Sequence, residues 1–271
     1  MHGKSALAAL VLRSILILLV ISSCGGDPVD NRRLNPDNPA DCDVLMIGNS
    51  LTGWHDVPGL LQALCDAGGK SVFVREAIYP GYTLEMIVAG TGVFDEVALR
   101  NWDYVVMQGS NYEIAFPERQ DEIIEPIEIL AASIRANDPA TRIIFFMDWA
   151  MKNGVTFDGR YYTFEEFQSM LRSGTLLLAG GMDFMVAPIG VAFGKVVAAR
   201  PDIDLFAPDG GHPSAGGAYL QACVYYSVIF RESAAGLCVS GELPPEQASF
   251  LQGVGAETVL DSLAQWNIPS N

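Results

Sequence analysis

The sequence predicts an α/β protein, a three-layer α/β/α sandwich around a five-stranded parallel sheet. Short apolar runs alternate along the chain with longer segments of helical periodicity, and Gly, Pro, Asn and Asp residues separate them. Half of the 271 residues are hydrophobic, which is enough apolar surface to cover both faces of a sheet. Strands that alternate with helices in this way favour parallel pairing with helices on both sides.

Five short apolar runs with turn residues at their ends are predicted to be the strands. They are residues 43–47, 71–77, 104–107, 142–147 and 184–187. The segments between and after them are predicted to be helical over residues 58–67, 84–88, 118–136, 164–178, 192–199 and 215–230, with one or two closing helices in 244–266. Gly68 and Gly69 end the first of these helices, and Pro126 predicts a kink or break in the third.

The first 23 residues are predicted to be a signal peptide. Lys4 and Arg13 supply positive charge, and residues 14–21 form an apolar core that is too short to span a bilayer. Small residues then precede Cys24, and the segment resembles a bacterial lipobox, which implies cleavage before Cys24 and lipid attachment to its sulfur. The alternatives are an ordinary secretory signal or an uncleaved anchor.

The remaining chain is predicted to be a flexible tether, residues 24–42, followed by one domain, residues 43–271. The tether is rich in Pro, Asn and Asp. This organisation predicts an exported protein that is bound to the bacterial cell envelope through the lipid on Cys24. The net charge of -16 argues against nucleic acid as a partner, because an acidic surface repels phosphates.

Cysteine count agrees with export. If Cys24 carries lipid, an even set of four remains, and these could form two disulfides in an oxidising compartment. Proximity in the sequence favours Cys42 with Cys65 and Cys223 with Cys238, and four buried free thiols are the alternative. The sequence carries no indication of oligomeric state.

A candidate nucleophile, Ser50, follows the first predicted strand after the turn Gly48-Asn49. This position is the carboxyl end of a strand, the edge at which open α/β sheets bind ligands. A serine nucleophile needs a base and a group that orients the base. With His2 in the signal peptide, the base must be His55 or His212.

His212 is the better candidate, since Asp209 lies three residues before it in a glycine-rich loop. Such a loop can hold the carboxylate against one imidazole nitrogen while the other nitrogen faces Ser50. The loop could instead be a surface turn or half of a metal site. Because the chain has few histidines and no cysteine cluster, no metal and no other cofactor is predicted.

Over most of the mature domain, the chain resembles the SGNH (GDSL-like) hydrolase superfamily, whose members have a flavodoxin-like fold. The family's first block is Gly-Asp-Ser, and Ser50 matches its nucleophile, with Asn49 in place of the usual aspartate. A Gly-Asn-Ser form occurs in some bacterial branches. Gly81 matches the second block, and the closing Asp-x-x-His block matches Asp209 and His212.

The third block of the family, Gly-x-Asn-Asp, matches at Gly109 and Asn111, but Tyr112 replaces the final aspartate. The resemblance implies a serine hydrolase in which Ser50, His212 and Asp209 form the catalytic triad. It also implies an oxyanion hole made by the backbone N–H groups of Ser50 and Gly81 and by the Asn111 amide. From the residues alone, Gly81 could be a plain turn and Asn111 a loop cap.

Four further side chains near these blocks are predicted to contact substrate: Gln108, Trp149, Tyr82 and Trp54. The aromatic residues could stack on a sugar ring or an acyl group, and core packing is the alternative. Gln108 could also be only a strand-end residue.

The resulting functional hypothesis is a serine esterase that forms an acyl-enzyme. The resemblance favours O-acetyl groups on carbohydrates as substrates, and short-chain esters and lysophospholipids are alternatives. The alternative is a surface glycan-binding lipoprotein that keeps the fold without turnover.

Overall fold

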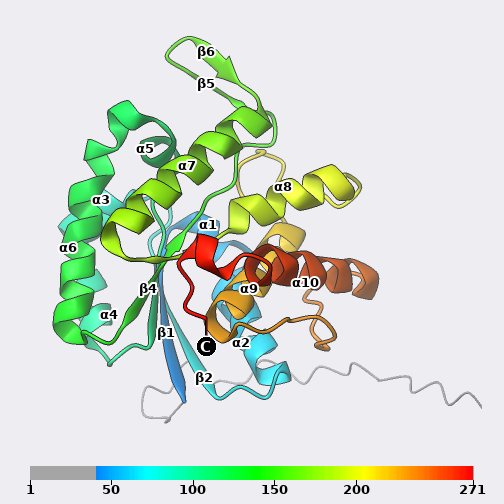
Figure 1. Cartoon of the computed structure of the whole chain (residues 1–271), viewed down its shortest axis with the longest axis horizontal. Coiled ribbons are helices and arrows are strands. Elements are labelled where there is room, and N and C mark those ends of the chain that lie inside the picture. The colour runs from blue at the N-terminus through cyan, green and yellow to red at the C-terminus, as the bar shows by residue number, and fades with distance from the viewer. Residues whose placement is uncertain (1–40, 271) are drawn as a thin grey trace, which may run out of the picture.

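The five predicted strands form one parallel sheet in the computed structural model of the protein, which describes residues 41–270 (Figure 1). The strand order is β2-β1-β3-β4-β7. The bounds are β1 Cys42–Gly48, β2 Val72–Ile78, β3 Tyr104–Met107, β4 Arg142–Phe146 and β7 Met185–Ala187. All five differ from the predicted ranges by at most one residue at either end, and the α/β/α prediction is confirmed.

Helices connect the strands and follow them. Their bounds are α1 Ser50–Gly53, α2 Val57–Ala67, α3 Leu84–Gly90, α4 Val93–Ala98, α5 Asn111–Ala115, α6 Asp121–Asn137, α7 Phe164–Met182, α8 Ile189–Ala199, α9 Ala215–Phe230 and α10 Pro245–Leu260. Short 3-10 turns lie at η2 Trp54–Asp56, η3 Pro117–Arg119 and η4 Leu263–Trp266. The segment predicted to hold one or two closing helices therefore holds α10 and η4.

Helices cover both faces of the sheet, as its apolar strands require. Helices α2, α8, α9 and α10 contact one another on one side, and α3, α4 and α6 contact one another on the other (Figure 1). Strand β3 is buried along its whole length, and β1 from Val44 onward. Helix α9 is buried on nearly every side because α2, α8 and α10 surround it, which explains its lack of a polar stripe.

The strand order brings three loops to one place. Strand β1 lies between β2 and β3, with Gly48 opposite Ile78 and Ile47 opposite Met107. Because all three strands are parallel, the segments that follow them leave the same edge of the sheet side by side. These segments contain Ser50, Gly81 and Asn111.

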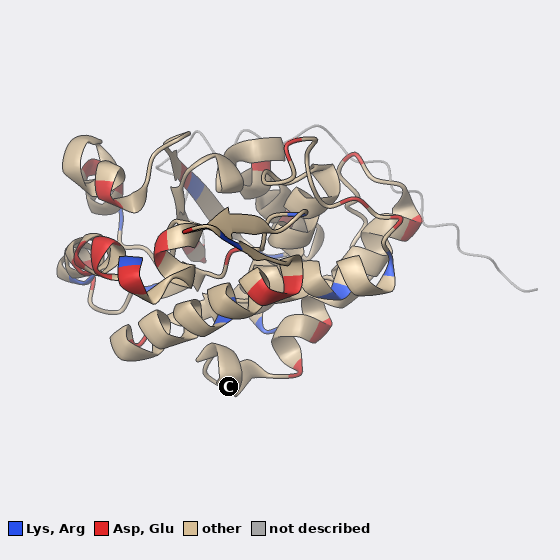
Figure 2. Ribbon diagram, turned by 90° about the horizontal axis from the view of Figure 1, so that it is seen from above, with Lys and Arg blue, Asp and Glu red and all other residues tan. Residues whose placement is uncertain are grey.

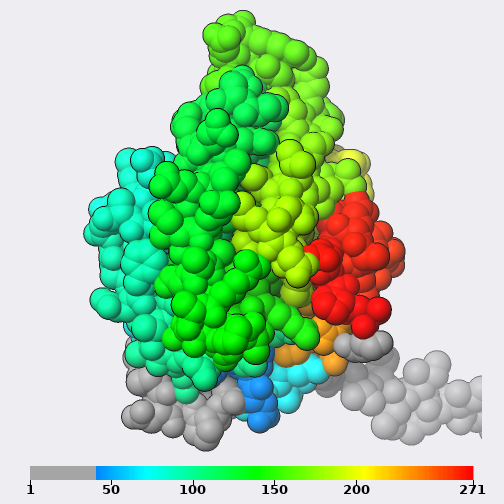
Figure 3. Space-filling model, turned by 60° about the vertical axis from the view of Figure 1, so that its left-hand side comes forward, coloured from blue at the N-terminus to red at the C-terminus, as the bar shows by residue number. Residues whose placement is uncertain are grey.

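A β-hairpin is the main feature that was not predicted. Strands β5 Val155–Phe157 and β6 Arg160–Tyr162 pair antiparallel and project beyond the helices (Figures 1 and 3). Asp158 and Gly159 form the two-residue turn, both with positive φ. Each strand is only three residues long, so neither shows an alternating pattern, but the Asp-Gly pair is a strong hairpin signal.

Two further expectations need correction. Helix α6 runs without interruption through Pro126, which is buried in its first half, so no break occurs there. Of the four cysteines, Cys42, Cys65 and Cys223 are free thiols, so neither the Cys42–Cys65 nor the Cys223–Cys238 disulfide forms. Three of the four have surroundings in which burial raises the pKa of the thiol, to about 12 for Cys42 and higher for Cys65 and Cys223.

The predicted leader, Cys24 and the tether up to residue 40 lie outside the described residues. Strand β1 begins at Cys42, so the end of the predicted tether belongs to the sheet. None of the helices within residues 41–270 combines the length and the apolar character needed to cross a bilayer. Acidic residues are spread over several helices, with basic residues between them (Figure 2).

Candidate active site

Ser50 is the first residue of α1, directly after the turn that ends β1. Asn49 is the N-cap of this helix, and its Oδ1 accepts a hydrogen bond from the backbone N–H of Leu51 at 3.0 Å. Gly48 is required before the turn, because a Cβ there would lie 2.6 Å from Gln108 Oε1 and 2.8 Å from Thr52 Oγ1. The close approach of these side chains to the backbone fixes the direction in which Ser50 leaves the strand.

The structure brings Ser50, His212 and Asp209 into one hydrogen-bonded chain, although 162 residues separate Ser50 from His212. Ser50 Oγ lies 2.8 Å from His212 Nε2, and His212 Nδ1 lies 2.6 Å from Asp209 Oδ2. The partner of Ser50 is thus His212 and not the alternative, His55. These distances are those of a nucleophile, a base and an orienting carboxylate.

The Asp209 carboxylate is held in its charged form. Its Oδ1 accepts hydrogen bonds from the backbone N–H groups of Gly211 and His212, both at 2.9 Å. These bonds and the one from His212 lower the pKa of Asp209 to about 2. An ionised carboxylate can only accept, so Nδ1 of His212 carries the hydrogen and Nε2 is free to accept from Ser50 O–H.

The loop that carries Asp209 and His212 is tied down on several sides. Its backbone closes on itself through Ala207 N to His212 O at 2.8 Å, and Lys152 N donates to Gly210 O, also at 2.8 Å. Gly210 has φ +73°, which favours glycine at this position. The loop therefore presents both side chains in a fixed orientation.

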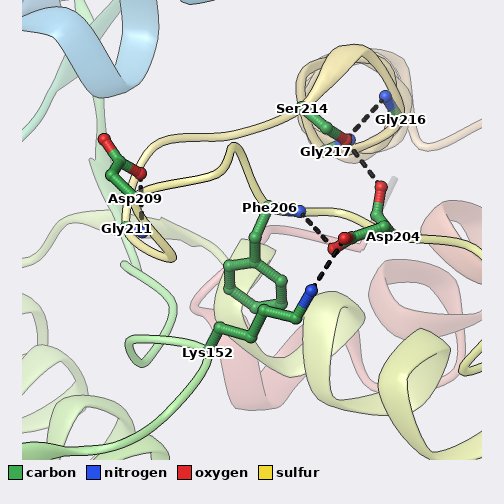
Figure 4. Close-up of polar contacts among 8 residues, drawn as sticks. All are labelled: Lys152, Asp204, Phe206, Asp209, Gly211, Ser214, Gly216 and Gly217. Carbon is green, nitrogen blue, oxygen red and sulfur yellow. Dashed lines mark hydrogen bonds and ion pairs between the residues drawn. The ribbon is translucent and has the colours of Figure 1, made fainter.

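The loop also leads directly into a capped helix (Figure 4). Ser214 Oγ accepts from Gly216 N at 3.1 Å and Gly217 N at 3.2 Å at the start of α9, and donates to Asp204 O at 2.7 Å. Lys152 forms an ion pair with Asp204 at 2.7 Å, across the same segment (Figure 4). The segment between β7 and α9 is thereby joined to the loop after β4.

Gly81 lies in the turn after β2, next to the Ser50 turn. Tyr79, Pro80, Gly81 and Tyr82 form a β-turn closed by Tyr82 N to Tyr79 O at 3.1 Å, with Gly81 at φ +79°. Proline at the second position and glycine with positive φ at the third are typical of a type II turn. A Cβ on Gly81 would meet nothing, so the backbone conformation, rather than lack of space, favours glycine.

Asn111 begins α5 after the carboxyl end of β3. Its side chain is half-buried and forms no hydrogen bond with any other residue in 41–270. Tyr112, which stands where the family has aspartate, packs on Phe116 and Phe167, with ring centroids 5.9 and 5.8 Å away. The replacement thus has a packing role.

Two of the four predicted substrate contacts are corrected by the structure. Gln108 is only 2% exposed, and its amide bonds to Asn49 and Thr52. Trp149 is 1% exposed, its ring stacks on Phe193 at 4.3 Å, and its indole N–H donates to Gly211 O at 2.9 Å. Both side chains are turned into the protein, where they hold the site together, so neither can contact substrate.

The other two aromatic side chains are accessible. Trp54 is 40% exposed and stacks on the imidazole of His212, with centroids 4.1 Å apart and an interplanar angle of 16°. Tyr82 is 44% exposed and lies in the turn beside Gly81. Stacking with the base is a contact of Trp54 that sequence reasoning missed.

Asp148 is a second feature that was not anticipated. This residue, between β4 and Trp149, is 1% exposed, and burial raises the pKa of its carboxyl to about 7. Its Oδ1 accepts from Trp149 N at 2.7 Å, and its Oδ2 has no partner among the described residues. The only signal in the sequence was its position after a strand, directly before Trp149.

Residues 41–270 contain no cluster of three or more His, Cys, Asp or Glu side chains that could hold a metal ion.

Several solved structures have the same fold as this chain. A DUF4886 family protein from Bacteroides uniformis matches with a TM-score of 0.70 and 17% identity, over 81% of this chain and 95% of that one. A putative SGNH hydrolase from Slackia heliotrinireducens matches with a TM-score of 0.54 and 22% identity, over 69% of this chain and 97% of that one. The acetyl xylan esterase AlAXEase matches with a TM-score of 0.56 and 13% identity, over 69% of this chain and 100% of that one.

The fold is therefore that of the SGNH hydrolases. No family model and no curated protein matches the sequence.

Proposed function

We propose that the protein is a serine esterase that cleaves carboxylic esters through an acyl-enzyme. The observation that supports this most strongly is the chain from Ser50 Oγ through His212 to Asp209, with distances of 2.8 and 2.6 Å. The chain lies at the carboxyl edge of the sheet, where open α/β folds bind their ligands.

In the first half-reaction, Ser50 Oγ attacks the ester carbonyl carbon while His212 Nε2 takes the hydroxyl proton. The negative charge on the carbonyl oxygen is stabilised by the N–H groups of Ser50 and Gly81 and by the Asn111 amide. Collapse of this intermediate breaks the bond to the alcohol oxygen, which receives the proton from His212. Asp209 stabilises the imidazolium in between, because its carboxylate stays charged.

In the second half-reaction, water replaces the alcohol. His212 takes a proton from the water as the water oxygen attacks the acyl carbon. The second tetrahedral intermediate releases the carboxylic acid, and His212 returns the proton to Ser50 Oγ.

The test is hydrolysis of p-nitrophenyl acetate by residues 41–271 as wild type, Ser50→Ala and His212→Ala. Loss of either side chain is expected to reduce kcat by at least about 10³-fold, since members of a triad act as a unit. His55→Ala is the matched control and should retain activity, because His55 does not contact Ser50. A wild type that is inactive on all short acyl esters, or a Ser50→Ala variant with unchanged activity, would contradict the proposal.

For the substrate we favour O-acetyl groups on carbohydrates. Trp54 and Tyr82 offer exposed rings beside Ser50 that suit the apolar face of a sugar, and one protein of the same fold is named an acetyl xylan esterase. Acetate release from acetylated xylan, compared with release from a lysophospholipid, separates this choice from a lipid substrate. In a non-catalytic glycan-binding protein, by contrast, a fluorophosphonate probe would not label Ser50.

We also propose that the protein is exported and bound to the cell envelope by lipid on Cys24. The support is the basic and apolar leader followed by small residues before that cysteine. Incorporation of labelled palmitate by the full chain, and its loss in Cys24→Ser, is the expected result. Unlabelled wild type would count against the anchor.

A further inference from the structure

The side chain of Asn49 connects three parts of the candidate active site. Its Oδ1 accepts from Leu51 N at 3.0 Å, in the helix that begins with Ser50, and from Gln108 Nε2 at 2.7 Å. Its Nδ2 donates to the carbonyl oxygen of Tyr82 at 3.0 Å, in the turn that contains Gly81. One amide thus bonds to the segments after β1, β2 and β3.

Gln108 holds Asn49 from the other side. Its Oε1 accepts from Asn49 N at 3.1 Å and from Thr52 Oγ1 at 2.7 Å, while its Nε2 donates to Asn49 Oδ1. The Gln108 amide therefore accepts from the backbone N–H of Asn49 and donates to its side-chain oxygen. It lies next to Gly48, whose lack of a Cβ makes room for Gln108. Since Gln108 is buried, water cannot replace these bonds at low cost.

The bond from Asn49 to Tyr82 determines where Gly81 lies. The turn is fixed to β1 at its start by Tyr79 N to Gly48 O at 2.9 Å. At its other end, the turn is fixed to the Ser50 segment by the hydrogen bond from Asn49 Nδ2 to Tyr82 O. Gly81 lies between these two attachment points, so the distance between the N–H groups of Ser50 and Gly81 depends on Asn49.

We infer that Asn49 is a positioning residue that sets the geometry of the oxyanion hole, and that an aspartate cannot replace it in this chain. The inference rests on the proposed esterase function. An aspartate would keep the acceptor for Leu51 N and Gln108 Nε2, but it has no hydrogen to donate to Tyr82 O. A carboxylate oxygen against that carbonyl would be repelled, and the Gly81 turn would lose its second attachment. The residue common in the resembling family is thus the wrong one for this site.

The test compares Asn49→Asp with a matched control, Asn137→Asp. Asn137 Nδ2 donates to Arg100 O at 2.7 Å, the same type of bond, at the far end of α6 from the site. Both variants are assayed with p-nitrophenyl acetate below their melting temperatures, and the rate of Ser50 labelling by a fluorophosphonate is measured in parallel.

Asn49→Asp is expected to lower kcat by about 10²-fold with KM nearly unchanged, because an oxyanion donor acts in the transition state and one such donor is worth about 10²–10³. Labelling of Ser50 should slow in proportion. Asn137→Asp should lose melting temperature without losing kcat, which separates positioning from general stability.

Wild-type kcat and labelling rate in Asn49→Asp would overturn the inference while leaving the esterase intact. A rise in KM with unchanged kcat would also overturn it, because that pattern indicates lost substrate binding. If the wild type itself is neither labelled nor active, the proposed function falls, and the inference falls with it.

Discussion

At the scale of single residues, Trp149 helps to hold the loop of Asp209 and His212 in place beside Ser50. This tryptophan was expected at the substrate, because it follows a strand at the functional edge, yet it is buried and bonds to Gly211 O. The end of a strand tells which edge a residue occupies, but only packing decides whether its side chain points to solvent or inward. The same reason explains the misplacement of Gln108.

Replacement of Trp149 by phenylalanine tests this role. The ring would still stack on Phe193, but the hydrogen bond to Gly211 O would be lost, and this half-buried carbonyl would lose its indole partner. Because such a bond contributes about 1 kcal/mol, we expect kcat/KM to fall roughly five- to tenfold. Trp266→Phe, which removes the equivalent bond to Thr258 O at 2.8 Å, serves as the control and should leave kcat/KM unchanged. Equal effects of the two substitutions would show that Trp149 has no special relation to the site.

At the scale of elements, the parallel sheet was predictable because each strand is a short apolar run between turn residues. The position of the site followed from it, since Ser50, Gly81 and Asn111 each come after a strand of the same sheet. The β5–β6 hairpin could not be found from periodicity, because three residues are too few to alternate. The favoured pairing of cysteines was wrong because proximity in sequence carries no information on the direction of a side chain.

The hairpin contacts α5, the helix that begins with Asn111. Phe157 of β5 stacks on Phe116 with centroids 3.8 Å apart, and it lies 6.0 Å from Tyr112. Tyr112 therefore replaces the family's aspartate with an aromatic contact that joins α5 to the hairpin. The position of Asn111 depends on this cluster of rings.

Phe157→Ala is accordingly expected to affect both stability and turnover. Loss of an aromatic pair costs about 0.5–1.5 kcal/mol beyond lost burial, and in a chain of this size 1 kcal/mol lowers Tm by roughly 2–4 °C. We expect a several-fold lower kcat as well, because α5 loses its support. Tyr161→Ala on the neighbouring strand, where the ring is exposed, should change neither quantity much. Thermal melts and esterase kinetics of the two variants decide the matter, and unchanged kcat in Phe157→Ala would refute the coupling.

For the whole molecule, the free thiols have a direct consequence. Cys42, Cys65 and Cys223 form no disulfide, so this part of the fold depends on its apolar core rather than on cross-links between these cysteines. Residues 41–271 should melt at the same temperature with and without dithiothreitol, within about 1 °C, whereas removing a disulfide typically costs 2–5 kcal/mol. A reagent that reacts with thiols should modify Cys42, Cys65 and Cys223 after unfolding, even without prior reduction. A fall in Tm on reduction would contradict the free-thiol state.

The stability of the whole molecule should also depend on pH through Asp148. Burial raises the pKa of the Asp148 carboxyl from 3.8 to about 7, and burial together with the charge of Asp148 raises the pKa of the Tyr225 hydroxyl well above its usual value. At pH values between the unfolded pKa of Asp148, 3.8, and its folded pKa, about 7, the folded state keeps the proton on Asp148 while the unfolded state releases it. The folded state then binds more protons, so the free energy of unfolding should fall as pH rises from about 4 to 7, by up to about 1.4 kcal/mol per pH unit from this group.

Asp148→Asn removes this titration and keeps an oxygen to accept from Trp149 N. Urea unfolding at several pH values should therefore show a smaller loss of stability toward neutral pH in the variant than in the wild type, with the variant the more stable of the two near pH 8. Parallel stability curves for wild type and Asp148→Asn would mean that the carboxyl of Asp148 is ionised in the folded protein. In that case the buried Asp148 would carry a negative charge next to Trp149, the residue that bonds to Gly211 O in the loop of Asp209 and His212.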